Sequence, residues 1–173
     1  MINDISEKVE KIIASGQSFL LVPLIDKILK KGLNTLATKP SPIKITSDFK
    51  IILTHYNNIE IEIEMSHLTK AIYLLFLKNN EPISLQKLHQ YRNELLEIYK
   101  QISYKNSIEE MEKSINTVVD IETRQIYMHL SRIKTAFYNK ISFRIASTYC
   151  VLGTKNKPKY IPIERKLVIW EIN

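Results

Sequence analysis

The spacing of hydrophobic residues changes along this chain in a way that requires both strands and helices. In residues 59–64 isoleucine and glutamate alternate strictly. This alternation predicts a half-buried strand with its acids in water. From Leu68 to Phe76 the apolar residues recur every three or four positions instead, which predicts a helix. We therefore expect an α+β fold.

A proline-containing break divides the chain into two parts. Residues 39–42 read Lys-Pro-Ser-Pro and end the helical spacing of residues 2–37. We expect a helical extension over residues 1–40 and a main domain over residues 43–173. The apolar stripe of the extension either caps the core of the domain or forms a homodimer, and no heptad register decides between the two.

The main domain is predicted to begin with strands and to end with a hairpin. Residues 43–64 should form an antiparallel meander of two to three strands. Four helices follow, and each starts at a residue that can cap it: Ser66, Ser84, Ser107 and Thr123. The last should run to about Asn139. The tail from residue 141 to residue 172 reads as strand-like, with a basic-tipped hairpin over residues 149–163.

The positive charge is concentrated in the last third of the chain. The formal net charge is +7, and residues 121–173 carry 10 basic and 3 acidic residues, whereas residues 1–120 carry 15 of each. Residues 123–160 contain eight Lys or Arg and no Asp or Glu. Such a surface favours a polyanion as partner, most commonly nucleic acid. A solvated surface without a partner and a docking site for an acidic protein are the alternatives.

The helix predicted from Thr123 has an apolar back and a basic front. Ile126, Leu130, Ile133 and Phe137 fall on one stripe. The other side carries groups that bind phosphates and base edges, and three lysines of the hairpin would contact the DNA backbone. The candidate DNA-binding residues are Arg124, Tyr127, Ser131, Arg132, Lys134, Thr135, Tyr138, Lys155, Lys157 and Lys159. His129 borders this face, either as a phosphate contact or as a boundary residue.

Several segments resemble a known DNA-binding family. Residues 83–88 read Ile-Ser-Leu-Gln-Lys-Leu and residues 129–137 read His-Leu-Ser-Arg-Ile-Lys-Thr-Ala-Phe. With the strand-to-helix segment 59–77 and the hairpin 149–163, they resemble the winged-helix effector domain of OmpR/PhoB-type response regulators. The resemblance covers residues 43–163 and implies a winged-helix-like fold that binds duplex DNA. The connection over residues 91–122 is longer than in that family and is predicted to hold a helical insert, and no receiver domain fits in residues 1–42.

A second resemblance is weaker. Residues 91–96 and 167–171 are similar to segments of a group of small bacterial proteins, which implies no activity.

The sequence indicates neither an enzyme nor a metal or cofactor site. It has three glycines and no phosphate-binding glycine loop, and its histidines do not pair at metal-ligand spacing. Glu60, Glu62 and Glu64 could line a cation site, but one solvated strand face explains them better. The single Cys150 suits a reducing cytoplasm. The longest apolar run, residues 19–25, is too short to span a bilayer, so we expect a cytoplasmic protein with no membrane contact.

These observations favour a DNA-binding protein, of the kind that regulates transcription. The alternative is a non-catalytic protein–protein interaction module on the same scaffold, which would use residues 92–122 as its docking surface.

Overall fold

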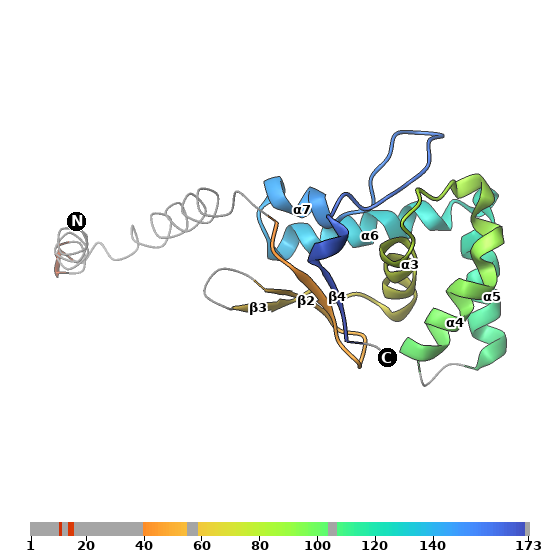
Figure 1. The fold of residues 1–173 in the computed structure, drawn as a ribbon, viewed down its shortest axis with the longest axis horizontal. Coiled ribbons are helices and arrows are strands. Elements are labelled where there is room, and N and C mark those ends of the chain that lie inside the picture. Colours follow the sequence, from red (N-terminus) through yellow and green to blue (C-terminus); the bar gives the residue numbers. More distant parts are fainter. Residues whose placement is uncertain (1–10, 12–13, 16–39, 55–58, 104–106, 172–173) are drawn as a thin grey trace. The chain divides into compact units, whose positions relative to one another are not determined.

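The computed structural model describes residues 11, 14–15, 40–54, 59–103 and 107–171. The chain divides into two compact units, Met1–Thr38 and Lys39–Asn173, and the second contains every element discussed below (Figure 1). Apart from the helical residues Lys11 and Ala14, the expected extension and its homodimer lie outside the described residues.

The unit Lys39–Asn173 has an α+β fold, as the change of hydrophobic spacing predicts. Three short strands come first, and helices and a fourth strand follow. In chain order, the elements are β1 (Ile43–Ile45), β2 (Ile51–Thr54), β3 (Glu60–Glu62), α3 (His67–Lys78), η3 (Leu85–Tyr91), α4 (Arg92–Ile102), α5 (Ile108–Val119), η4 (Ile121–Thr123), α6 (Gln125–Lys140), α7 (Phe143–Tyr149), η5 (Arg165–Leu167) and β4 (Val168–Trp170).

The sheet has the strand order β3-β2-β1-β4. The three strands of the predicted meander are antiparallel to one another, and the pair Ile43 and Leu53 lies in register. The fourth strand comes from the end of the chain and pairs with β1 in parallel, with Val168 opposite Ile43. Since β4 is only three residues long, its hydrophobic pattern alone could not reveal its partner strand.

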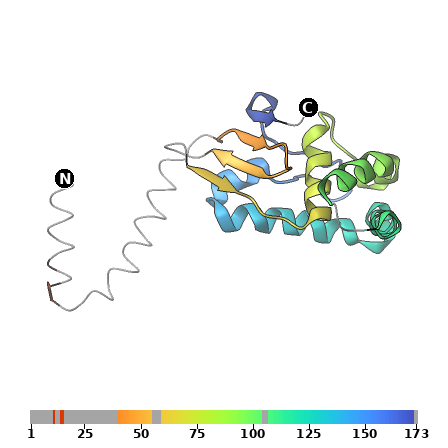
Figure 2. The same cartoon turned by 90° about the horizontal axis from the view of Figure 1, so that it is seen from below.

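Helix α3 is the centre of the helical layer. Its residues 71–77 are all buried, which is the pattern of a helix covered on every side. Figures 1 and 2 show the sheet on one side of α3 and the pair α4 and α5 on the other, while α6 runs along the unit past both. No described helix is both long and apolar enough to cross a membrane.

Most predicted helix starts are correct, although their capping differs. Ser107 is the N-cap of α5, and its hydroxyl accepts a hydrogen bond from the Glu110 N–H at 3.1 Å. Ser66 and Ser84 occupy N-cap positions but make no capping hydrogen bond through their side chains. At α6 the N-cap is Arg124, not Thr123, although the Thr123 hydroxyl still accepts a hydrogen bond from the Gln125 N–H at 3.3 Å.

The prediction that residues 141–149 are strand-like is wrong. They contain the helix α7, which follows the N-cap Ser142. Its buried residues Ala146 and Tyr149 are three positions apart, and the Tyr149 hydroxyl donates a hydrogen bond to the Ser41 carbonyl at 2.7 Å. Residues three positions apart lie on the same face of a helix, so both side chains can be buried together. In a strand they would point to opposite faces.

The predicted hairpin is present as a loop, residues 150–163, which we call the wing. One antiparallel bridge between Leu152 and Tyr160 closes it, and its returning arm also pairs with Ile83 through Lys159. The segment that precedes η3 therefore joins the wing to the helical layer. A helical layer with an insert, α5, and a bridged loop after its last helices is consistent with a winged-helix-like layout.

Candidate nucleic-acid interface

Helix α6 presents two different faces. Ile126, Ile133 and Phe137 are fully buried, and Leu130 is half-buried, so the predicted apolar stripe is confirmed. The polar residues of the opposite side are exposed to solvent. They are Arg124 at the N-cap and Ser131, Arg132, Lys134 and Thr135 within the helix.

Aromatic packing fixes the orientation of α6. The Phe137 ring lies 5.3 Å from that of Tyr73 on α3 and 5.6 Å from that of Tyr149 on α7, measured between centroids. Offset and tilted ring pairs of this kind add about 0.5–1.5 kcal/mol beyond burial. Because Phe137 is fully buried and contacts both of these rings, the opposite, polar face of α6 is turned to the solvent.

His129 belongs to the core and not to the exposed face. It is 4% exposed, and its Nδ1 lies 2.9 Å from the Thr69 hydroxyl, which in turn lies 2.8 Å from the Ser66 hydroxyl. Burial, with a smaller effect of the nearby Arg132 charge, lowers the pKa of His129. A phosphate contact is therefore excluded. The sequence signal was its position, three residues after Ile126 and four before Ile133, at the edge of the apolar stripe.

The N-terminus of α6 has an unusual backbone. Arg124 adopts a left-handed conformation with φ 57°, which is uncommon for a residue other than glycine. Its carbonyl accepts the Tyr127 N–H at 3.1 Å, and its side chain is exposed. Tyr127, one turn further on, is 45% exposed.

Lys159 has a structural role in the wing, contrary to the prediction that it contacts DNA. The residue is 7% exposed, and its ammonium donates hydrogen bonds to the carbonyls of Gly153 at 2.8 Å and Thr154 at 2.6 Å. Its burial lowers its pKa. Lys155 and Lys157, by contrast, are exposed at the tip. Their places in the wing explain the difference, because Lys159 lies in the arm that pairs with Ile83, whereas Lys155 and Lys157 lie in the turn at the tip.

The wing tip and the N-terminal part of α6 lie together. A hollow of about 60 Å³ lies between them, and η3 and η4 complete its walls. Its lining residues are Ser84, Leu85, Gln86, Ile121, Tyr127, Asn156, Lys157 and Lys159. The two elements that the sequence proposes for one partner therefore share one surface at this point.

A second contact region connects the middle of α6 to the start of the wing. Lys134 is close enough to Cys150 for its charge to oppose the rise in the thiol pKa, which burial brings to about 11. The Lys134 ammonium also lies 5.2 Å from the centre of the Tyr138 ring, and Tyr138 packs on Phe143 at 5.0 Å. Tyr138 is thus half-buried and supports Lys134.

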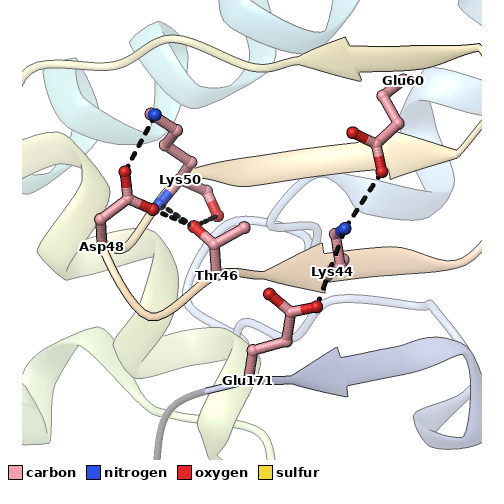
Figure 3. Close-up of polar contacts among 6 residues, drawn as sticks. All are labelled: Lys44, Thr46, Asp48, Lys50, Glu60 and Glu171. Atoms are coloured by element: carbon pink, nitrogen blue, oxygen red, sulfur yellow. Dashed lines mark hydrogen bonds and ion pairs between the residues drawn. The ribbon is translucent and has the colours of Figure 1, made fainter.

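The cations of this surface differ from those of the sheet in their partners. On the sheet, Lys44 pairs with Glu60 at 3.0 Å and Glu171 at 3.7 Å, and Lys50 pairs with Asp48 at 2.9 Å (Figure 3). On α6, α7 and the wing, no carboxylate of the described residues pairs with the cations Arg124, Arg132, Lys134, Arg144, Lys155 and Lys157. We call these six cations the basic surface.

One of these six cations lies on α7, which was not expected to be a helix. Arg144 is exposed on α7, and Phe143 beside it is 71% exposed. Sequence reasoning missed both as site residues because their segment was assigned to a strand, although Arg144 lies in the acid-free stretch.

Two of the three glutamates considered as a cation site interact with lysines instead. Glu60 pairs with Lys44, and Glu64 lies 3.9 Å from Lys140 at the end of α6. Within the described ranges, no group of three or more His, Cys, Asp or Glu side chains is placed to hold a metal ion.

Comparison of the chain with protein-family models, with curated proteins and with solved structures finds no match.

Proposed function

We propose that this protein binds duplex DNA through α6 and the wing. The observation that carries the proposal is the basic surface, whose six cations have no carboxylate partner among the described residues. Lysines of the sheet are paired with acids instead. Unpaired cations attract phosphates because binding releases the counterions that surround DNA.

The shape of α6 supports insertion into a groove. With 16 residues and a rise of about 1.5 Å per residue, its length is roughly 24 Å. A major groove about 12 Å wide admits one helix. Ser131 and Thr135 lie on the exposed face and can bind base edges, while Arg132 and Lys134 on either side can bind the phosphates that border the groove.

The hollow between α6 and the wing supports a backbone contact. Tyr127 and Ser84 bring hydroxyls to its walls, and Lys157 brings an ammonium. These are groups that commonly bind phosphate oxygens. A phosphate placed here would fix the register of α6 along the duplex.

A protein–protein interaction module is the second candidate function. Its predicted docking surface, residues 92–122, includes α4 and α5, and α5 begins with Ile108, which is 59% exposed and would suit a protein partner. The rest of its apolar stripe, Met111 to Val119, is buried against the unit itself. Since most of the insert is used for internal packing, DNA binding has the stronger support.

The test is a gel shift with mixed genomic DNA fragments at low salt. Arg132→Glu combined with Lys134→Glu should abolish retention of DNA and leave the circular dichroism spectrum unchanged. The matched control is Lys87→Glu combined with Lys113→Glu, which changes the net charge equally at exposed lysines outside the basic surface. Equal loss of binding in both variants would mean that only net charge matters, and unchanged binding in the first would refute the proposal.

A protein partner gives a different result in the same variants. Capture of a partner that survives the reversal of Arg132 and Lys134, and is lost in Ile108→Glu, would identify the interaction module instead.

A further inference from the structure

A second site lies away from the basic surface. A cavity of about 330 Å³ is formed where the β1–β2 turn, α3, α4 and the end of β4 meet. Figure 1 shows the turn and the end of β4 at the same edge of the unit as α4. The lining residues are Phe49, Leu74, Lys78, Ile98, Gln101 and Trp170.

One aromatic wall is held by a strained turn. Phe49 has φ 59°, a left-handed conformation that is strained for a bulky residue. Its N–H donates to the Thr46 carbonyl at 2.9 Å, and the Lys50 N–H donates to the Thr46 hydroxyl at 2.9 Å.

The side chains around Phe49 reinforce the turn (Figure 3). The Thr46 hydroxyl donates to the Asp48 carboxylate at 2.5 Å, and the Lys50 ammonium lies 2.9 Å from that carboxylate. The Thr46 hydrogen bond, followed by that of Lys50, lowers the pKa of Asp48 to about 2. This network holds the Phe49 ring inward, where it is 9% exposed.

The other aromatic wall is Trp170. It is 39% exposed, although it is a large apolar residue at the edge of a mostly apolar cavity. Leu74 and Ile98, on α3 and α4, line the cavity between these walls and are almost fully buried. Ligand sites typically combine such apolar walls with a few polar groups that fix orientation.

Two of the lining residues have polar ends, the ammonium of Lys78 and the amide of Gln101. Lys78 is paired with Glu94 at 3.5 Å, and its side chain is 63% exposed. An exposed ion pair is weak because water screens it, so Lys78 can exchange Glu94 for the carboxylate of a ligand at small cost. The cavity is roughly twice the 150 Å³ or so that holds benzene in an engineered core, which leaves room for a ring and a short side chain.

We propose that this cavity binds a small aromatic carboxylate. The ring lies between Phe49 and Trp170, and the carboxylate accepts hydrogen bonds from the Lys78 ammonium and the Gln101 amide N–H. This inference goes beyond the proposed DNA binding and does not depend on it.

Trp170 is the only tryptophan of the chain, so its fluorescence reports directly on this cavity. The probes are hydrocinnamate and its neutral counterpart hydrocinnamide, titrated into the whole protein without DNA. We expect hydrocinnamate to change the tryptophan emission saturably and to bind about tenfold more tightly than the amide, as a charge-assisted hydrogen bond would provide.

Lys78→Met should abolish the preference for the carboxylate, and Lys113→Met, which removes an ammonium from α5, should leave it unchanged. Equal affinity for both probes, or a preference that survives Lys78→Met, would overturn the proposal. Equilibrium dialysis repeats the measurement without fluorescence, and absence of hydrocinnamate binding there would also overturn it. Because no step involves DNA, failure here leaves the proposed function untouched.

Discussion

At the scale of single residues, backbone conformation determines which type of residue some positions can hold. Gly153 has φ 140°, and a Cβ atom there would lie 2.6 Å from the Pro158 carbonyl oxygen and 2.8 Å from the Lys159 Cδ. A side chain at this position therefore meets both strain and a steric clash, and Gly153 is required for the wing to close.

We predict that Gly153→Ala destabilises the wing by about 1–3 kcal/mol. The measurement is hydrogen exchange of the Leu152 and Tyr160 amides, which donate the two hydrogen bonds of the wing bridge. Thr154→Ala, at an exposed position in the same turn, is the control. Unchanged protection of both amides in Gly153→Ala would contradict the clash.

His129 predicts a dependence of stability on pH. Its pKa in the folded protein is lowered from 6.5, so below about pH 6.5 the unfolded chain binds the proton more readily than the folded one. The free energy of unfolding should therefore fall as pH drops through this window. Above this window His129 is neutral in both states, so the stability is fully present and no longer depends on the titration of His129.

Urea denaturation at a series of pH values measures the effect. His129→Asn keeps a polar group that can form a hydrogen bond with the Thr69 hydroxyl but does not titrate, so its stability should change less between pH 7 and the acidic end of the window than that of the original protein. Identical pH profiles would show that His129 takes up its proton without cost.

At the scale of elements, the wing is held by a buried cation instead of a long ladder of hydrogen bonds. One bridge closes it and a second joins it to Ile83, and the ammonium of Lys159 crosslinks the carbonyls of its first arm. The element therefore depends on Lys159 for order, while Lys155 and Lys157 are exposed at its tip, where we propose that they contact DNA.

Lys159→Met and Lys157→Met should thus have different effects. The first leaves the Gly153 and Thr154 carbonyls without their donor, and we expect a loss of about 1–3 kcal/mol in wing stability with faster exchange of the Tyr160 amide. The second should leave exchange unchanged and weaken DNA binding. If Lys157→Met destabilised the wing as much as Lys159→Met, the assigned roles would be wrong.

At the scale of the whole molecule, the sheet and the basic surface differ in how their cations are paired. The sheet pairs its cations with acids, and the basic surface does not. Each phosphate contact contributes roughly −0.9 to the slope of log affinity against log salt. The measured salt slope therefore gives the number of phosphates that the proposed surface contacts.

We predict that Lys155→Gln combined with Lys157→Gln reduces the magnitude of the salt slope by about 2, since two phosphate contacts are removed. Fluorescence anisotropy of a labelled duplex over a salt series measures both slopes. A slope equal to that of the unchanged protein would show that the wing tip does not reach the DNA backbone.

The sequence alone determined the α+β class, the first three strands, the helix starts at residues 66 and 107, and the apolar stripe of α6. These features depend on hydrophobic spacing and helix capping, which involve only residues close together in the sequence. The concentration of positive charge in the last third was also evident from the sequence, because it requires only a count of charged residues.

Tertiary structure decided the rest. Pairing of β4 with β1 joins segments more than a hundred residues apart, and three residues carry too little pattern to specify a partner. Residues 143–149 are helical because Tyr149 packs on Phe137 and bonds to Ser41, neither of which is a local neighbour. His129 and Lys159 are likewise buried, because their hydrogen-bond partners lie on α3 and in the wing turn. Local sequence sets which side chains a segment offers, and long-range packing sets which of them face the solvent.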